Sequence, residues 1–284
     1  MIRIKVYRFN YKLLVASIII AIIGLCFALY HCAFAKTEEK ISVPIIMYHS
    51  ILKEGNGEYS ITPEVFESDL KKIQENGYQT IVMEDLIQYV YEDKELPPKP
   101  IILTFDDGFY NNKEYAVPLL EKYHMKAVIS VIGKYTEAFT KTDETNMQYG
   151  HLRWKDINQL IQSQTIEFQN HTYHLHKIQN GRKGIMKKKE ESIEQYKQTI
   201  GGDLEKLQED FKENTGYLPN TFTYPYGAVS KESEDVLKEL GFQASLSCKE
   251  GSNQITKNKD CLYGLKRYDR KKGITTEQVF KHIL

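Results

Sequence analysis

Short apolar runs rich in β-branched and aromatic residues recur along the chain and alternate with segments of helical spacing. The runs predict strands at residues 43–48, 80–82, 101–105, 127–132, 165–168, 221–224, 244–247 and 262–266. Helical patterns occur between them, at residues 62–77, 115–123, 154–163, 185–215 and 230–240. Strands that alternate with helices are typical of parallel βαβ units. The pattern therefore predicts an α/β fold, and seven or eight such units fit a (β/α) barrel.

The first 35 residues have the pattern of an export signal or a membrane anchor. Basic residues at positions 3–12 precede an apolar stretch at residues 13–30, and no acidic residue interrupts them. That stretch has a length at the lower limit for crossing a bilayer, and Ala33-Phe34-Ala35 resembles a signal-cleavage site. An anchor in the cell membrane through residues 13–30 and a cleaved signal both remain open. Either one places the rest of the chain outside the cytoplasm.

The predicted organisation is a signal or anchor at residues 1–35, a polar linker at 36–42 and one folded domain at 43–284. Acidic and basic residues number 38 each, and four of the basic ones lie in the first 35 residues. The remainder is therefore slightly acidic, which argues against a nucleic-acid partner, because such a partner requires a basic face. Two cysteines remain in the folded domain, Cys248 and Cys261. They would be able to pair in an oxidising compartment, and the absence of a C-x-x-C pair argues against a thiolate zinc site.

Candidate catalytic residues follow the predicted strands. The strand at 101–105 runs into Asp106-Asp107-Gly108, where a barrel enzyme keeps its active site. One carboxylate would bind a metal while the other accepts a proton. The alternative is an ordinary Asp-Gly turn.

A histidine cluster follows the strand at 165–168. His171, His174 and His176 fall within six residues, and a carboxylate with two neutral imidazoles forms a ligand set that leaves positions open for water and substrate. We expect His174 to be the one outside this set. A third strand end, Tyr224-Pro225-Tyr226-Gly227, would expose backbone N–H groups and aromatic rings, unless it is only a turn.

These motifs, in this order, resemble those of the polysaccharide deacetylases, the NodB-homology group of carbohydrate esterase family 4. The matching segments are Thr104-Phe105-Asp106-Asp107-Gly108, His171-Thr172 with a later histidine, and Tyr224-Pro225-Tyr226-Gly227. The resemblance implies a distorted (β/α)7 barrel over roughly residues 43–270. It also implies a hydrolase that acts on carbon–nitrogen bonds other than peptide bonds.

The resemblance assigns a role to each matching residue. It implies that Asp106 is the catalytic base and that Asp107, His171 and His176 bind a divalent metal. It implies that the backbone N–H of Tyr226 helps to hold the oxyanion, with Tyr224 beside it at the substrate. Zinc is the expected ion, although nickel or cobalt would also suit imidazole and carboxylate ligands.

The sequence departs from the commonest pattern of the family. Leu175 stands where the second metal-binding histidine is usual, and the form His-Thr-Tyr-x-Leu-His looks like the branch that acts on poly-β-1,6-N-acetylglucosamine in biofilm matrix. That branch also implies that His49, in Met47-Tyr48-His49-Ser50, is the general acid. The arginine that usually orients the base is missing before Tyr224, so Arg267 or Arg270 is expected in its place.

The expected activity is therefore metal-dependent N-deacetylation of a cell-surface polysaccharide that contains N-acetylglucosamine, with release of acetate. An exopolysaccharide and cell-wall peptidoglycan both remain open as substrates. An esterase for O-acetyl groups and a weakened glycan-binding homologue are the alternatives. A glycosidase is disfavoured because Asp106 and Asp107 are adjacent, whereas glycosidases place two carboxylates on either side of the scissile bond.

Overall fold

The computed structural model describes residues 11–34, 40–55 and 57–283, and the chain divides into two units, Met1–Glu39 and Lys40–Leu284. In the first unit, helix α1 spans Tyr11–Phe34. None of the helices in the described ranges combines the length and the hydropathy that crossing a bilayer requires. The basic residues at 3–8, Ala35 and residues 36–39 of the predicted linker lie outside the described residues.

The second unit is built on one parallel sheet, which confirms the α/β prediction. Its strands lie in the order β12, β11, β8, β7, β6, β2 and β14, and β5 pairs with the first half of β6. Their bounds are Ala244–Leu246 (β12), Thr221–Thr223 (β11), Ile166–Asn170 (β8), Ala127–Val131 (β7), Pro100–Phe105 (β6), Ile45–Tyr48 (β2), Tyr268–Asp269 (β14) and Gln79–Ile81 (β5).

The segment at residues 265–269 joins the two edges of this sheet. Leu265 forms a parallel bridge with Leu246, beside β12, while Tyr268 in β14 pairs with Ile46 in β2. The sheet is therefore curled until one short segment contacts both of its ends, as in a distorted barrel. The predicted strand at 262–266 was wrong, because only Leu265 forms a bridge there and the strand begins at Tyr268.

Three small sheets flank the main one. They are the antiparallel pair β1 (Ile41–Val43) and β13 (Asn253–Ile255), the parallel pair β3 (Ser50–Ile51) and β4 (Ser60–Ile61), and the hairpin of β9 (Ile178–Gln179) and β10 (Arg182–Lys183). The predicted strand at 43–48 is split between β1 and β2. Pro44 lies at the break, where its missing N–H would interrupt a ladder.

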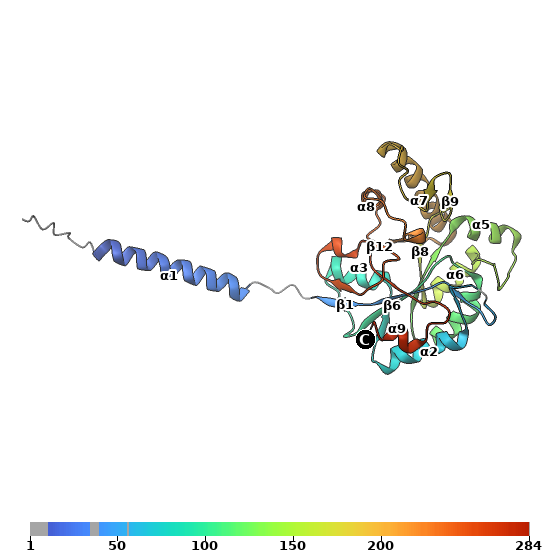
Figure 1. The fold of residues 1–284 in the computed structure, drawn as a ribbon, viewed down its shortest axis with the longest axis horizontal. Helices are drawn as coiled ribbons and strands as arrows, with labels where there is room; N and C mark the ends of the chain where they lie inside the picture. Colours follow the sequence, from blue (N-terminus) through green and yellow to red (C-terminus); the bar gives the residue numbers. More distant parts are fainter. Residues whose placement is uncertain (1–10, 35–39, 56, 284) are drawn as a thin grey trace, which may run out of the picture. The chain divides into compact units, whose positions relative to one another are not determined.

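Helices surround the strands β6, β8 and β12 (Figure 1). Their bounds are Pro63–Glu75 (α2), Met83–Glu92 (α3), Val117–Lys122 (α4, preceded by a π-turn at Asn112–Ala116), Gly133–Thr142 (α5), Trp154–Ser163 (α6), Ile193–Thr215 (α7), Ser233–Glu239 (α8) and Thr276–Phe280 (α9); short 3₁₀ turns occur at Pro225–Gly227 and Lys259–Leu262. Helix α7 begins eight residues later than predicted. Ser192 and Gln195 form a capping box that starts it at Ile193.

Strand β6 shows how the core holds the site. All six of its residues are buried, because Ile101, Leu103 and Phe105 pack into one apolar cluster and Ile102 packs into another. Both faces of the strand are therefore covered, as its continuous apolar sequence predicts. This rigid strand ends at Phe105 and delivers the two aspartates that follow to the edge of the sheet.

Candidate metal centre and catalytic residues

Every predicted site residue lies at or beyond the carboxyl end of a strand of the main sheet. Asp106 follows β6, His49 follows β2, and His171 follows β8. These strands are parallel and close together in the sheet, so their carboxyl ends meet at one edge.

The structure brings Asp107, His171 and His176 together. Oδ1 of Asp107 lies 3.5 Å from Nε2 of His171 and 3.3 Å from Nε2 of His176. One potential ligand atom from each residue lies within 4.8 Å of the other two. Nδ1 of His171 donates a hydrogen bond to the carbonyl oxygen of Thr223 at 2.8 Å, so in the neutral form of this imidazole the lone pair is on Nε2, toward Asp107.

The carboxylate of Asp107 fits a cation. Its Oδ1 is buried and accepts no hydrogen bond from any residue that the structure describes. A buried oxygen of this kind is costly unless something satisfies it. Two imidazole nitrogens and one carboxylate oxygen facing a common point form a donor set that suits a divalent metal.

Backbone turns aim these side chains. Asp107 and Gly108 both have φ near 70°, which turns the chain sharply as it leaves β6. A Cβ at Gly108 would lie 2.8 Å from Cγ1 of Val131, so only glycine fits there. Thr172 also has a positive φ, and the segment from His171 to His176 is an irregular loop. The two histidines therefore face one point despite a spacing that would separate them on a helix.

Burial and neighbouring charges shift the pKa of each of the three clustered residues. Burial opposes ionisation of Asp107, but the two neighbouring histidines outweigh it and hold its pKa well below the usual value. Burial would lower the pKa of His171, yet the aspartates raise it. Burial and the positive charge of His171 lower the pKa of His176 to about 4, so this imidazole is neutral at neutral pH and suited to bind a metal.

Asp106 is held by an arginine. Nη1 and Nη2 of Arg267 donate to the two carboxylate oxygens of Asp106 at 2.7 and 2.9 Å, and both side chains are buried. Nε of Arg267 donates to the carbonyl oxygen of Ser247 at 2.8 Å. Burial opposes ionisation of Asp106, but the guanidinium and nearby histidines lower its pKa below the usual range. Of the two arginines expected here, Arg267 orients Asp106, while Arg270 pairs with Asp69.

His49 lies near the aspartates. Its ring contacts the ring of Tyr59, with centroids 4.8 Å apart, and its Nδ1 is buried without a hydrogen-bond partner among the described residues. Asp269, at the end of the neighbouring strand β14, also has a buried carboxylate oxygen without such a partner. Burial raises the pKa of Asp269, and the charge of His49 acts against that rise, so the two side chains interact electrostatically.

The two tyrosines of the third motif differ. Tyr226 has φ of 56°, and its ring packs on His176 at 4.5 Å, at the edge of the cluster. Tyr224 requires a correction: its ring is buried against Phe222, and its N–H donates to the carbonyl oxygen of Leu246. Neither the ring nor the N–H of Tyr224 is free for a substrate. The ring is packed in the apolar core, and the N–H already has its hydrogen-bond acceptor.

The other residues of the motifs are placed as follows. His174 is exposed and lies outside the ligand cluster. Cys248 and Cys261 are both free thiols, so the pairing considered from the sequence is not formed.

Two residues that no sequence motif indicated support the metal ligands. Asp203 on α7 accepts the backbone N–H groups of Tyr173 and His174 at 2.8 and 2.9 Å, which fixes the loop between the histidine ligands. His151 lies with its Nδ1 2.9 Å from the carbonyl oxygen of Asp107 and donates to it. Both contacts join segments far apart in the sequence, so no local signal reveals them.

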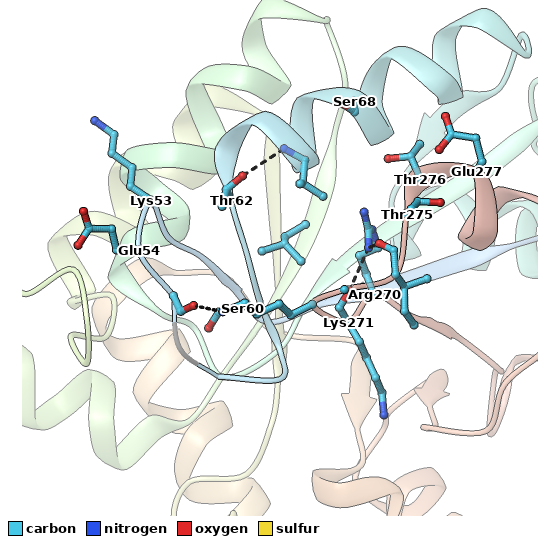
Figure 2. A pocket seen from close by; sticks show the side chains of 16 residues that line it. Lys53, Glu54, Ser60, Thr62, Ser68, Arg270, Lys271, Thr275, Thr276 and Glu277 are labelled. Atoms are coloured by element: carbon cyan, nitrogen blue, oxygen red, sulfur yellow. Dashed lines mark hydrogen bonds between the residues drawn. The ribbon is translucent and has the colours of Figure 1, made fainter.

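A cavity of about 630 Å³ lies away from these residues. Ser60, Thr62, Arg270 and Thr276 are among the residues that line it (Figure 2). Of the residues considered for the site from the sequence, only Arg270, which pairs with Asp69, lines this cavity; the candidate metal ligands, Asp106 and His49 do not.

Comparison with known proteins decides the family. The model of the family described as polysaccharide deacetylase matches residues 93–245, just over half of the 284 residues. The chain belongs to the polysaccharide deacetylase family. It is accordingly a hydrolase that acts on the N-acetyl amide bonds of a polysaccharide.

Several curated proteins are similar to this deacetylase. A polysaccharide deacetylase of Bacillus subtilis (strain 168), named YxkH, is 29% identical over 221 residues, which are 78% of this chain and 69% of that protein. The poly-β-1,6-N-acetyl-D-glucosamine N-deacetylase of Staphylococcus aureus (strain MSSA476) is 25% identical over 72% of this chain and 66% of its own length. The Escherichia coli (strain K12) protein of the same name is 23% identical over 72% of this chain, which spans only 34% of that protein.

Solved structures share the fold. A de-N-acetylase from Aggregatibacter actinomycetemcomitans has a TM-score of 0.71 at 19% identity, with 86% of this chain and 98% of that chain covered. The Streptococcus pyogenes deacetylase PplD has a TM-score of 0.70 at 20% identity, with 86% and 99% covered. These similarities support the assignment of the distorted (β/α) barrel.

Proposed function

We propose that this deacetylase is metal-dependent and removes N-acetyl groups from a polymer of N-acetylglucosamine, with release of acetate. The observation that carries the metal dependence is the buried, unpartnered Oδ1 of Asp107, which faces Nε2 of both His171 and His176. Zinc is the first choice for this donor set, and nickel or cobalt would also suit it.

Poly-β-1,6-N-acetylglucosamine is the substrate we propose. Two observations support it: the relatives from Escherichia coli and Staphylococcus aureus are named for that polymer, and the spacing His-Thr-Tyr-x-Leu-His resembles that branch. Peptidoglycan is the second candidate, since it also carries N-acetylglucosamine.

The mechanism assigns a role to each group at the site. A cation held by Asp107, His171 and His176 would supply Lewis-acid chemistry, polarising the acetyl carbonyl and acidifying water. Asp106 is ionised and is held in place by Arg267, so it accepts the proton of the water that attacks the carbonyl carbon. The backbone N–H of Tyr226 would donate to the oxyanion that develops on the acetyl oxygen.

The leaving amine needs a proton when the carbon–nitrogen bond breaks. His49 is our candidate for this general acid, because it follows β2 on the other side of Asp106 from the histidine ligands. Asp269, at the end of the strand that pairs with β2, has a buried carboxylate oxygen without a partner among the described residues and interacts electrostatically with His49. The products are acetate and a glucosamine unit with a free amino group.

We also propose that the catalytic domain works outside the cytoplasm. The support is the sequence of residues 1–35, in which basic residues precede an apolar stretch and an Ala-x-Ala segment. Protease treatment of intact cells tests the location, since an extracytoplasmic domain is degraded while cytoplasmic markers survive. The size of the mature protein then distinguishes an anchor from cleavage after Ala35.

Metal analysis combined with an acetate assay tests the proposed activity. The protein is assayed on β-1,6-linked N-acetylglucosamine oligomers, on peptidoglycan and on an O-acetylated xylan, with and without a chelator. We expect acetate release from the N-acetylated oligomers, loss of release with the chelator, and recovery with zinc. Faster release from the xylan would instead favour an O-acetyl esterase.

Variants of the ligands sharpen this test. Asp107→Asn and His171→Ala should each abolish acetate release and weaken metal binding. His174→Ala is the matched control, because His174 is an exposed histidine of the same loop outside the cluster. Full activity of Asp107→Asn or His171→Ala would remove that residue from the ligand set.

A further inference from the structure

A cavity of about 140 Å³ lies at the β9–β10 hairpin, and none of the candidate metal ligands lines it. Its polar lining consists of three cationic side chains and two amides: Lys177, Arg182, Lys188, Gln179 and Asn180. No acidic side chain lines it among the described residues. Clefts that bind drug-sized ligands have volumes of about 300–1,000 Å³. This cavity, called here the basic pocket, therefore suits a small anionic group better than an oligosaccharide.

The hairpin and the loop after it bring these cations together. Asn180 and Gly181 have φ of 52° and 74°, as a two-residue hairpin turn requires. Glu191 then ties the loop to the hairpin, because its carboxylate accepts from the guanidinium of Arg182 and, at 3.1 Å, from the backbone N–H of Lys188. The guanidinium is buried and also donates to a backbone carbonyl of the same loop at 2.8 Å. One wall of the basic pocket is therefore fixed before any ligand binds.

The positive charge at the basic pocket is only partly neutralised. Glu191 offsets Arg182, whereas Lys177 and Lys188 form no ion pair with any residue that the structure describes. Residues 177–189 contain six basic residues and no acidic one, in a domain that is slightly acidic as a whole. Cations gathered around one cavity repel one another, so an anion bound there would stabilise them.

We propose that the basic pocket binds a phosphate group of an anionic polymer with phosphodiester links, and so holds the enzyme on that polymer. Arginine, lysine, asparagine and glutamine are the side chains that contact phosphodiesters in nucleic-acid complexes, and all four types line the pocket. The remaining lysines of the segment, Lys183, Lys187 and Lys189, extend the positive charge beyond the pocket. A chain of phosphates would use that extension, whereas a free phosphate ion would not.

The basic pocket adjoins the candidate metal centre without being part of it. Leu175 and Lys177, which line the pocket, are the neighbours of the candidate ligand His176 in the sequence. Nζ of Lys183 lies 5.8 Å from the centre of the ring of Tyr226. An anionic polymer held at the pocket would therefore keep the catalytic residues near N-acetylated units that are linked to it or lie beside it. Binding of the polymer requires neither the metal nor turnover, so it is measured independently of the proposed function.

Binding of a fluorescent poly(glycerol phosphate) to the full-length protein, measured by fluorescence anisotropy, tests this proposal. The wild type should bind at low salt and release the polymer at about 1 M salt, where charges are screened beyond about 3 Å. Lys177→Gln with Lys188→Gln should weaken binding about tenfold or more. These two lysines form no ion pair among the described residues, so a thermal scan should show that the double variant is folded. Wild-type binding that does not respond to salt would overturn the proposal without any variant.

Two control variants locate the binding. Lys126→Gln with Lys212→Gln removes the same charge from two exposed lysines outside the basic pocket, and should bind the polymer as the wild type does. Asp107→Asn should also bind it as the wild type does, because the candidate metal centre is not used. Equal losses for the two lysine pairs would show a general response to net charge, and loss of binding in Asp107→Asn would place the phosphate at the metal centre. Either result would overturn the proposal.

Competitors identify the ligand. Inorganic phosphate should displace the polymer only at high concentration, because a single group lacks the further contacts of a chain. Polyglutamate, single-stranded DNA and the neutral polymer dextran should compete weakly or not at all. Inorganic phosphate as effective as the polymer, at equal phosphate concentration, would make the pocket a site for the free ion. Polyglutamate or DNA as effective as the polymer, or a wild type that binds no poly(glycerol phosphate), would also contradict the proposal.

Discussion

This deacetylase contains two buried aspartate–arginine pairs. Their arginines, Arg267 and Arg270, lie close together in the sequence, whereas their aspartates do not. Arg267 donates to both oxygens of Asp106 at 2.7 and 2.9 Å, and Arg270 donates to both oxygens of Asp69 at 2.7 and 3.3 Å. All four side chains are almost fully buried. By geometry alone the two pairs are nearly equivalent, and from the sequence either arginine would serve the catalytic base.

The pairs differ in what else surrounds the carboxylate. Asp69 also accepts hydrogen bonds from the hydroxyls of Thr276 and Tyr48, and burial raises its pKa despite Arg270. Asp106 receives its side-chain hydrogen bonds from Arg267 and has the charges of His171 and His49 nearby, and its pKa is lowered. One carboxylate is enclosed by structural partners, whereas the other is ionised beside a candidate metal centre.

The largest effect should come from the catalytic pair. Asp106→Asn should lower deacetylation by about 10²–10⁴-fold, because an amide cannot accept the proton of water. Metal content should stay near the wild-type value, whereas Tm should fall because Arg267 is left buried without its carboxylate. Acetate release, metal analysis and a thermal scan measure the three. Loss of the metal in this variant would instead make Asp106 a ligand.

The structural pair should respond in the opposite way. Arg270→Met leaves the buried Asp69 without its cation and should lower the free energy of unfolding by about 3–5 kcal/mol, as measured by urea denaturation. Its kcat per folded molecule should be unchanged. Arg267→Met is the matched variant, and it should lose both stability and kcat. Equal loss of kcat in the two variants would contradict the division between the pairs.

A smaller effect is expected where an aspartate positions metal ligands without touching them. Asp203→Asn replaces one of the two oxygens that accept the N–H groups of Tyr173 and His174, and should weaken metal binding about tenfold. Titration with zinc measures the affinity, and added zinc should restore kcat. Glu205→Gln, an exposed change on the same helix, is the control. An unchanged metal affinity for Asp203→Asn would show that the carboxylate of Asp203 is not needed to fix the loop that carries the histidine ligands.

The smallest effect concerns a partly buried carboxylate that pairs with no cation among the described residues. Burial raises the pKa of Glu167 to about 7, and its oxygens accept the N–H groups of Met83 and Glu84. In the unfolded chain a glutamate has a pKa of about 4.3, so stability should fall as pH rises from about 4 to about 7. Because Glu167 is partly exposed to solvent, which screens its interactions, Glu167→Gln should flatten this change in Tm by only about 2–4 °C, which corresponds to about 1 kcal/mol. Identical pH profiles for the two proteins would argue against ionisation of Glu167 in this range.

The sequence by itself determined the parts of the fold that depend on local pattern. The apolar run of β6 and the helical pattern of α6 were placed within a residue of their observed bounds, because an unbroken apolar run and a helical periodicity are both local signals. The motifs at Asp106, His171 and Tyr226 were found for the same reason: each is a short segment that ends a buried strand. The order of such segments was enough to indicate the family, which the comparisons show.

The tertiary structure alone decided which distant residues meet. Arg267, rather than Arg270, reaches Asp106 across 161 residues because the segment at 265–269 closes the sheet. The same closure brings Asp269 beside the strand that precedes His49. The burial of Tyr224 also depends on how helices pack over strands. Sequence periodicity reports the neighbours of a residue along its own element, and these contacts join different elements, so only the packed chain determines them.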